Sequence, residues 1–564
     1  MGEFMRAVQV QIHNIRSIND ATIDLCDLSL LAGANNAGKS NIIDAIRLFY
    51  ADLKWDEKRD SALISGVDND SWVEIEFMPT EEELKQLKDE YRSTNGTFRV
   101  RNYFKAHLGL DGKLLSGYYA YVDGKLSDTL FYGAKNVGSA KVGKLVYIPA
   151  VSKVDEHTKL TGPSALRDLV AAVMAKVVAT SPAYEALEKA FASFEEQIKA
   201  QENEEGLSLL GLEAQITEEL ADWDSSFNFG IHSIQPDDIL KSLIHPTLTD
   251  DTHGGEVDQL QFGAGFQRHL VYSLIKLASK YSSVYKPTST KKEFSPELTW
   301  LLFEEPEAFL HPVQEEVLYD SLLDMVADGA TQVLLTTHSS RFVSRSMNDL
   351  TRLIRLRRER GVTVTFQIDD VGLDQLFDAS LMADAEIDPE ILQGNNKPAN
   401  EAMAALKIEL WMQPQRAAAF FARRVILVEG PTELALYSYL VAKGLLNAAP
   451  PGVMILDSMG KYNLHRLMAL LGIFGIDHSV FYDGDNGGSH DIEVTKTITD
   501  SKNPYTRQIV RLPKDIENEL GIPPLPRDKS SRKPQYLLYH LEANKVGRDK
   551  IEGIVKTFED LSNK

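Results

Sequence analysis

The sequence predicts an α/β chain with a nucleotide-binding unit at its N-terminus and a smaller doubly wound parallel sheet at its C-terminus. The first observation is a glycine-rich segment, Gly33–Ser40, that follows an apolar run and precedes a helical pattern. The second is the alternation of apolar runs with helical patterns after Arg424. At 564 residues the chain is too long for one core, so several domains are expected.

Composition narrows the class of protein. One cysteine, Cys26, excludes an intrachain disulfide, and no apolar run approaches the ~20 residues that span a bilayer. We therefore expect a cytoplasmic protein without a membrane segment. The net charge of −22 means that nucleic acid, if bound, must meet local basic patches or metal ions. Two basic patches are Arg352, Arg355, Arg357, Arg358 and Arg360, interpreted as a solvated face, and Arg527, Lys529, Arg532 and Lys533.

The segment Gly33–Ser40 has the GxxxxGKS spacing of a P-loop, with a strand before it and a helix after it. Glycines let backbone N–H groups wrap phosphates, Lys39 neutralises the β- and γ-phosphates, and Ser40 reaches Mg²⁺. The pattern predicts binding of ATP or GTP. The expected nucleotide contacts are Gly33, Asn35, Asn36, Ala37, Gly38, Lys39, Ser40 and Asn41.

Further motifs follow the P-loop in the chain. The strand-like run Leu298–Phe303 ends in Glu304 and Glu305, and a second run, Val333–Thr337, ends at His338. Together with the opening strand and its Asn14–Ser17 turn, this order resembles the ATP-binding-cassette heads of the RecF and SMC type. The resemblance implies that Glu304 holds Mg²⁺, Glu305 polarises water and His338 contacts the γ-phosphate. It also implies a variant signature motif at Gly263, Gly265 and Gln267, with glycine at 263 where serine is usual.

The ATPase domain is expected over residues 5–375, with a helical insertion at about 152–258 that is too short for a coiled-coil arm and is a candidate for dimerisation. Helices are predicted at Ser164–Ala179, Tyr184–Gln201 and Ile216–Phe227. A helical linker is expected over 376–420, and the second domain over 421–564.

In the second domain, two predicted strands end in acidic residues. Val425–Val428 runs into Glu429, with Pro431 opening a helix, and Ser479–Tyr482 runs into Asp483 and Asp485. Ligands of open α/β sheets bind at the carboxyl ends of the strands, so these acids suggest a divalent-metal site. The alternative is that they are solvated loop acids.

More acids extend this candidate site. Glu433 lies one helical turn beyond Glu429, and a later acidic run contains Asp515, Glu517 and Glu519. Clustered carboxylates that hold two ions about 4 Å apart are what a two-metal phosphodiesterase needs. Glu429, Asp483 and Asp485 suit one ion, and Glu433 with the later acids suits the other. Lys533 is a candidate for the transition-state contact, or else a solvated lysine in a basic loop.

The glutamate after the first strand and the Asp483-Gly484-Asp485 segment resemble a Toprim domain. The tandem of an ATPase head and this domain resembles the OLD-family nucleases, which include the nuclease of the Gabija system. That resemblance implies cleavage of DNA with two Mg²⁺ or Mn²⁺ ions, a homodimer or higher oligomer through the ATPase heads, and a role in bacterial defence against phage. A defence-system partner protein is a further possibility that the sequence leaves open.

Two other functions remain open from the sequence. One is an ATP-driven DNA clamp or repair scaffold of the RecF/SMC type without nuclease activity. The other is an effector that acts on RNA. No motif reports whether ATP activates or restrains cleavage, because that is a coupling free energy between two sites.

Overall fold

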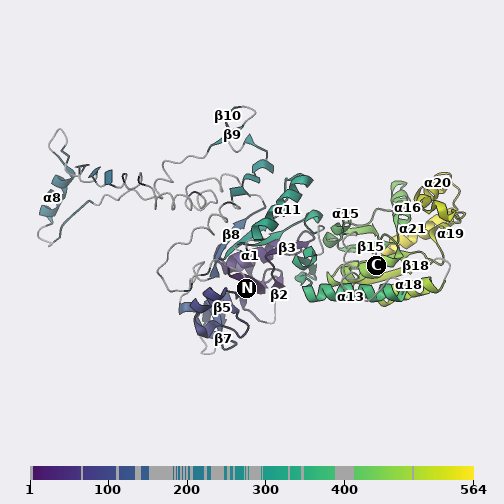
Figure 1. Ribbon diagram of the computed structural model, residues 1–564, viewed down its shortest axis with the longest axis horizontal. Coiled ribbons are helices and arrows are strands. Elements are labelled where there is room, and N and C mark those ends of the chain that lie inside the picture. The colour runs from purple at the N-terminus through teal and green to yellow at the C-terminus, as the bar shows by residue number, and fades with distance from the viewer. Residues whose placement is uncertain are drawn as a thin grey trace. The chain divides into compact units, whose positions relative to one another are not determined.

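The structure is a computed structural model in which the chain separates into two compact units. One unit combines Met1–Ala150 with Lys292–Lys564, and the other is Val151–Lys291. Figure 1 colours the chain from purple at the N-terminus to yellow at the C-terminus. The structure describes residues 4–64, 68–108, 114–133, 142–150, 298–327, 331–343, 348–387, 412–484 and 488–563, with Gly329 and short stretches between 170 and 296.

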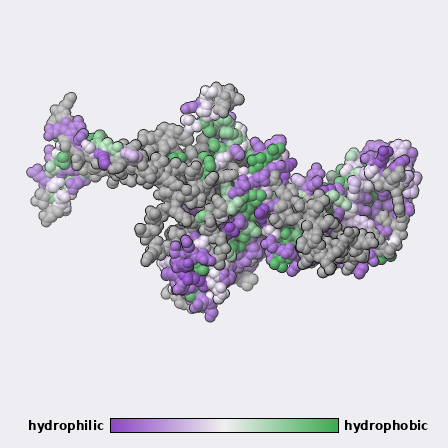
Figure 2. Space-filling model, in the orientation of Figure 1, coloured by the Kyte–Doolittle hydropathy of each residue, from purple (hydrophilic) through white to green (hydrophobic). Residues whose placement is uncertain are grey.

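An antiparallel sheet opens the ATPase part, with strand order β2-β1-β4-β5-β6-β7. The alternating run Val8–Ile12 has the sequence pattern of an edge strand, but it lies inside the sheet because β1 pairs with both β2 and β4. Its alternation reflects one buried and one half-exposed face. Figure 2 shows hydrophilic side chains gathered over the region of β5 and β7. The strands are β1 (Arg6–Ile15), β2 (Ile18–Asp24), β4 (Ser71–Met78), β5 (Phe98–Leu108), β6 (Leu114–Val122) and β7 (Lys125–Leu130).

A second sheet, ordered β14-β13-β3-β12-β11-β8, carries the nucleotide motifs. Its strands are parallel except β14, which pairs antiparallel with β13. The central strand β3 is fully buried, as expected for a strand covered on both faces. The strands are β3 (Leu28–Gly33), β8 (Lys144–Ile148), β11 (Thr299–Glu304), β12 (Thr331–Thr336), β13 (Leu353–Glu359) and β14 (Val362–Phe366).

Helices of the ATPase part include α1, whose buried apolar side chains join a core shared with both sheets. This arrangement places the start of α1 directly after the end of β3, as the P-loop pattern predicted. The helices are α1 (Lys39–Phe49), α2 (Glu57–Asp60), α3 (Glu81–Gln86), α11 (Pro312–Ala327) and α12 (Asn348–Arg352), with 3₁₀ turns η1 (Asp89–Tyr91), η2 (Phe131–Gly133) and η5 (Ser340–Val343).

The C-terminal domain is a parallel sheet of order β16-β15-β17-β18, which confirms the doubly wound fold. Its strands are β15 (Arg424–Val428), β16 (Val453–Asp457), β17 (Asp477–Tyr482) and β18 (Thr506–Arg511). Its helices are α16 (Pro431–Ala442), α17 (Leu464–Ile473), α18 (Ser489–Asp500), α19 (Ile516–Glu519), α20 (Lys533–Glu542) and α21 (Arg548–Asn563), with η8 (Lys461–Asn463) and η9 (Arg527–Arg532). In the part of the chain that the structure describes, no helix has the length and apolar character to cross a membrane.

The second compact unit contains α8 (Leu209–Glu219) and the hairpin of β9 (Leu248–Asp250) and β10 (Gly255–Val257). The predicted helix at Ile216–Phe227 overlaps α8 only over Ile216–Glu219, so its bounds are wrong. α8 begins earlier, after the Ser208 N-cap, whose hydroxyl accepts from the Gly211 N–H. The predicted helix Ser164–Ala179 lies outside the described residues except at Val170, and Tyr184–Gln201 is described only in part.

Between the domains, α13 (Asp370–Ile387) runs across residue 375, where the sequence placed a boundary. The helix packs on α17 and α18, and Arg466 Nε donates to Ser380 Oγ at 2.6 Å. The chain then continues through α15 (Pro414–Ala417) and η7 (Ala418–Phe421) into β15. Residues 388–411 of the expected linker lie outside the described part.

The interpretation of the arginine-rich run as a solvated face is wrong for its central members. Arg355 is only 2% exposed, and its guanidinium donates to the carbonyls of Phe420, Ala422 and Phe474 at 2.8–2.9 Å. Arg357 pairs with Asp477 at 3.1 Å. The side chains of these two arginines extend from β13 and donate hydrogen bonds to backbone carbonyls just before β15 and β17 of the C-terminal sheet. They therefore join the two domains.

Candidate active sites

The P-loop joins β3 to α1 in a backbone shape that excludes side chains at its second glycine. Gly38 has φ 111°, and a Cβ there would lie 2.3 Å from Thr363 Oγ1. Thr363 in β14 donates to the carbonyl of Ala37 at 3.0 Å. The Thr363 side chain therefore holds the loop against the sheet through the Ala37 carbonyl, next to the start of α1, where a helix N-terminus favours an anion.

Lys39 is folded over this loop. Its Nζ donates to the carbonyls of Gly33 and Ala34 at 2.9 and 3.2 Å, and the residue is 7% exposed. Burial lowers the pKa of Lys39 to about 8, while Glu305 and Glu307 oppose that shift. A phosphate placed beside Lys39 would favour the charged ammonium.

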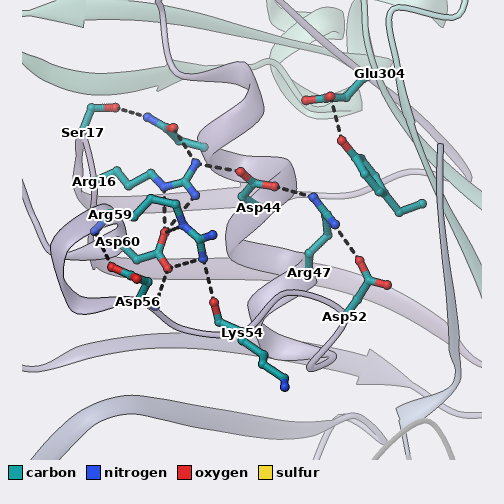
Figure 3. Close-up of polar contacts among 12 residues, drawn as sticks. Arg16, Ser17, Asp44, Arg47, Asp52, Lys54, Asp56, Arg59, Asp60 and Glu304 are labelled. Atoms are coloured by element: carbon teal, nitrogen blue, oxygen red, sulfur yellow. Dashed lines mark hydrogen bonds and ion pairs between the residues drawn. The ribbon is translucent and has the colours of Figure 1, made fainter. Parts of the chain in front are cut away.

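The other predicted P-loop contacts differ in environment. Asn35, Asn36 and Ser40 are exposed, and Asn36 has a positive φ of 65°. Asn41 is engaged elsewhere, because its Nδ2 donates to Ser17 Oγ at 2.7 Å. Its side chain therefore faces the network around Arg16 and Asp44 that Figure 3 shows.

The acids at the end of β11 lie next to the end of β12. The Glu305 N–H donates to the Thr336 carbonyl at 3.0 Å, and His338 Nε2 lies 3.5 Å from Glu305 Oε1. Burial and the charge of Lys39 lower the pKa of His338, and Glu305 opposes them. Glu304 accepts a hydrogen bond from the hydroxyl of Tyr147 at 2.9 Å. The structure thus brings Glu305, His338 and Lys39 into one electrostatic group.

Sequence reasoning missed two residues here. Glu307 accepts from the N–H groups of His338 and Ser339 at 2.6 and 3.2 Å, so it fixes the loop that carries the histidine. Burial raises the pKa of Glu307. The acidic run that starts at Glu304 could have indicated Glu307, whereas nothing local indicated Tyr147.

The predicted signature residues Gly263, Gly265 and Gln267 belong to the second compact unit. Gln267 donates its N–H to the Gly263 carbonyl at 3.1 Å and its Nε2 to the Phe262 carbonyl at 2.7 Å. Gly265 and Gln267 are helical. Their role toward a nucleotide stays a prediction.

In the C-terminal sheet, two of the predicted acids meet. β15 and β17 are parallel neighbours with Val428 opposite Phe481, and the Asp483 N–H donates to Glu429 Oε2 at 3.0 Å. Gly484 lies so close to β18 that a Cβ would be 2.1 Å from the Leu512 carbonyl oxygen. Glycine is therefore required directly after Asp483.

Glu433 and Glu517 complete the buried part of the acidic group, and both are 3% exposed. Glu433 Oε2 accepts from the Gly430 N–H at 2.9 Å, and Lys533 Nζ lies 3.5 Å from Glu517 Oε1. Burial alone would lower the pKa of Lys533, but Glu517, Asp483 and Asp515 together raise it. The lysine therefore belongs to the same electrostatic group.

The remaining predicted ligands are placed differently. Asp515 is the N-cap of α19, where its Oδ1 accepts from the Asn518 N–H at 2.7 Å. Glu519 follows Glu517 by two positions on the helix, so the two side chains point to different faces. Asp485 lies outside the described residues.

Comparison with known proteins agrees with this architecture. Residues 5–108 and 68–343 match the model of the AAA ATPase domain. The chain belongs to the AAA ATPase family. Residues 420–485 match the model described as "Overcoming lysogenization defect protein-like, TOPRIM domain". The expected OLD-like tandem of an ATPase and a TOPRIM domain, the architecture of an ATPase with endonuclease activity, is thereby confirmed.

Individual relatives are more distant. The chain is 24% identical over 511 residues to "Old nuclease" of Escherichia phage P2, covering 85% of this chain and 77% of that protein. Among solved structures, Stu0660 of Streptococcus thermophilus is 8% identical with a TM-score of 0.37, covering 71% of this chain and 84% of the other. The SMC head domain from Thermotoga maritima is 12% identical with a TM-score of 0.30, covering 64% and 99%.

The TOPRIM acids are suited to a divalent cation. Asp483 Oδ1 is buried without a hydrogen-bond partner among the described residues, and the buried carboxylate of Glu517 has only the ion pair with Lys533 Nζ at 3.5 Å in the described part of the chain. Buried carboxylate oxygens require a counter-charge, and hard oxygen donors are the ligands of Mg²⁺ and Mn²⁺. Within the described ranges, which omit Asp485, no three acidic, histidine or cysteine side chains already converge as a metal cage.

The pKa values of the TOPRIM acids predict how a cation changes stability. Burial, followed by the charges of Glu433 and Glu429, raises the pKa of Asp483 from 3.8 to about 8. Burial, followed by Glu429, raises the pKa of Glu433 from 4.5 to about 7. Because both folded-state pKa values are raised, their contribution to stability is complete only below the ordinary values of 3.8 and 4.5. It falls progressively as pH rises from there and is lost at about pH 7 for Glu433 and about pH 8 for Asp483.

We therefore expect Mg²⁺ to raise the Tm more at about pH 9 than at about pH 6, by roughly 2–4 °C, the shift that 1 kcal/mol gives in a large domain. Differential scanning fluorimetry with EDTA or Mg²⁺ at both pH values measures this. The Asp483→Asn variant is the control and should lose most of the difference. An equal Mg²⁺ effect at both pH values would contradict the role of these acids.

Proposed function

We propose that this protein is an ATP-regulated, divalent-metal-dependent DNA endonuclease of bacterial anti-phage defence. The observation that carries the proposal is the contact between Asp483 and Glu429, which joins two strand tips of the TOPRIM sheet within one buried acidic group. The relative from phage P2 is named a nuclease, which supports the same activity.

The acids divide into two sets of candidate ligands. Glu429, Asp483 and Asp485 are proposed to hold one Mg²⁺ or Mn²⁺ ion. Glu433, Asp515, Glu517 and Glu519 are the candidates for the second, and Glu519 is the weakest member because it is half-buried and lies on a different face of α19 from the buried Glu517. When bound, such ions activate a water molecule and stabilise the charge on the phosphodiester.

Lys533 and the basic turn before it are the proposed contacts for DNA. Lys533 begins α20, and η9 places Arg527, Lys529 and Arg532 directly upstream. Lys533 lies beside Glu517, where its charge would steady the phosphate during cleavage. Basic side chains next to an acidic metal site let a chain of net charge −22 bind a polyanion locally.

Regulation by ATP is supported by contacts that join the two domains. Arg355 lies on β13, which pairs with β3 before the P-loop, and it binds the carbonyls that flank β15 and β17. The ring of His338 lies 6.3 Å from that of Phe421, three residues before β15. β15 leads to Glu429. A change in the position of His338, the residue expected to contact the γ-phosphate, could therefore be transmitted through Phe421 and β15 to the TOPRIM acids.

Cleavage of supercoiled plasmid tests the function directly. The wild-type protein should nick or linearise the plasmid with Mg²⁺ or Mn²⁺ but not with EDTA, and the rate should change when ATP is added. Duplex DNA, single-stranded DNA and RNA of one sequence should be compared. ATP-dependent retention of DNA without cleavage in any metal would favour the clamp, and cleavage of RNA alone would favour the RNA effector.

A homodimer through the ATPase heads is also proposed. Val313 and Val317 at the start of α11 are 63% and 53% exposed, and Phe309 before them is 66% exposed. Figure 2 shows apolar atoms over the region of α11. This surface follows the acids of β11 in the chain, so a second copy docked on it would lie near a nucleotide site.

We expect the double substitution Val313→Glu and Val317→Glu to weaken ATP-dependent dimerisation at least about tenfold, because it buries two charges in the interface. Light scattering with a non-hydrolysable ATP analogue measures the mass. The matched control is Val371→Glu, since Val371 on α13 is also 63% exposed. Unchanged mass in the double variant would exclude this surface as the interface.

A further inference from the structure

Tyr147 lies between the P-loop helix and the end of the acidic strand. It belongs to β8, which pairs in parallel with β11, and Tyr147 stands opposite Leu302. Because side chains alternate along a strand, Glu304 points to the same face two residues further on. The tyrosine hydroxyl donates to Glu304 Oε2 at 2.9 Å.

The other side of the tyrosine ring meets α1. The Arg47 guanidinium carbon lies 3.6 Å from the ring centroid, a close cation–π contact. Arg47 is itself fixed by Asp44 at 2.9 Å and Asp52 at 2.7 Å. Figure 3 shows Arg47 between these two aspartates and the hydrogen bond that reaches Glu304. The ring is therefore held by the helix that begins at Lys39.

Glu304 has a property that makes this contact useful. Its carboxylate stands at the end of a long side chain, so the backbone alone does not fix the direction of the carboxylate. It is half-buried and stands at the tip of β11, where a cation can reach it. A hydrogen-bond donor on one oxygen fixes the rotation and leaves the other oxygen for a metal ion.

We propose that Tyr147 is a positioning residue of the ATPase reaction, whose hydroxyl orients the Glu304 carboxylate for the Mg²⁺ of the bound nucleotide. This rests on the proposed ATPase function. Tyr147 does not touch the nucleotide in this scheme, and it acts only through Glu304.

The test is the Tyr147→Phe variant, which keeps the ring under Arg47 and removes only the hydroxyl. Binding of a fluorescent ATP analogue is measured with EDTA and across a range of Mg²⁺ concentrations, alongside the rate of ATP hydrolysis. Without metal, the variant should bind as the wild type does. With Mg²⁺, it should need about tenfold more metal for half-maximal binding and hydrolysis, as expected for a lost hydrogen bond to a charged group.

Tyr121→Phe is the matched control. The Tyr121 hydroxyl donates to Glu74 Oε2 at 2.8 Å, and Arg99 lies 4.3 Å over its ring, so the same kind of contact is removed from the antiparallel sheet. This control should leave the Mg²⁺ dependence unchanged. An equal loss in both variants would overturn the proposal, because it would indicate a general effect of stability.

A double-mutant cycle separates positioning from other effects. Glu304→Asp withdraws the carboxylate by one methylene, beyond reach of the hydroxyl at 2.9 Å. Adding Tyr147→Phe to it should then change the Mg²⁺ requirement less than about twofold, and a full tenfold effect would overturn the inference. Failure of the wild type to bind nucleotide would reject the ATPase function itself. If Tyr147→Phe shows the same Mg²⁺ dependence as the wild type, only the role of Tyr147 is rejected.

Discussion

Replacement of Asp483 by asparagine is expected to reduce DNA cleavage about 10³-fold, equivalent to about 4 kcal/mol of barrier, while nucleotide binding is retained. Asp483 is central to the acidic group, since Glu429, Glu433 and Glu517 all act on its charge. Its buried Oδ1 lacks a hydrogen-bond partner in the described part of the chain, so a cation is the partner that the substitution removes. Plasmid nicking measured over time gives the rate.

Glu429→Gln tests the same site without breaking its geometry. The amide oxygen of glutamine can still accept the Asp483 N–H, so the strand tips stay joined while one charge is lost. Cleavage should fall by a similar factor. Asp500→Asn, at the exposed end of α18, is the control and should cleave normally.

Stability distinguishes a metal site from a structural cluster. Without metal at about pH 9, Asp483→Asn should melt no lower than the wild type, because it relieves repulsion among buried carboxylates. The rise in Tm on addition of Mg²⁺ should be lost. Mg²⁺-dependent cleavage that survives in both Asp483→Asn and Glu429→Gln would remove the TOPRIM acids as the site of cleavage.

The parts of the fold that sequence predicted are those set by local rules. The P-loop could be predicted because the spacing of its glycines is specific to one backbone conformation. The contact between Glu429 and Asp483 could be predicted because the carboxyl ends of parallel strands lie at the same edge of a sheet. Glu433 was predicted one helical turn beyond Glu429. The structure places it at the third position of α16, after the Gly430 cap, whereas Glu429 precedes the helix.

What sequence could not predict depends on distant partners. Arg355 was interpreted as solvated, because its carbonyl acceptors lie 65 and 119 residues away in the chain. Tyr147 lacks a local motif, since its partner Glu304 is 157 residues away. Glu517 and Glu519 are both glutamates of the same acidic run, so the sequence alone does not distinguish them. The start of α19 after the Asp515 N-cap determines that Glu517 is the buried one.

Replacement of Glu305 by glutamine is expected to slow ATP hydrolysis about 10²- to 10³-fold while ATP still binds. Glu305 stands 3.5 Å from His338 and has a φ of 43°, a conformation that an L residue rarely adopts, so the backbone holds its carboxylate in a specific direction. Glutamine has the same size but is a far weaker base. Release of phosphate and binding of an ATP analogue measure the two effects, and Glu81→Gln on the exposed surface of α3 is the control.

The same variant measures the coupling between the domains. Because Glu305→Gln keeps ATP bound, its cleavage rate with ATP should stay at the ATP-bound value of the wild type, whether that value is higher or lower than without ATP. Coupling through His338, Phe421 and β15 requires the cleavage rates with and without ATP to differ. ATP can shift the protein between two conformations only if it binds one of them more tightly than the other. A cleavage rate that is the same with and without ATP, in both the wild type and Glu305→Gln, would mean that the nuclease works independently of the nucleotide.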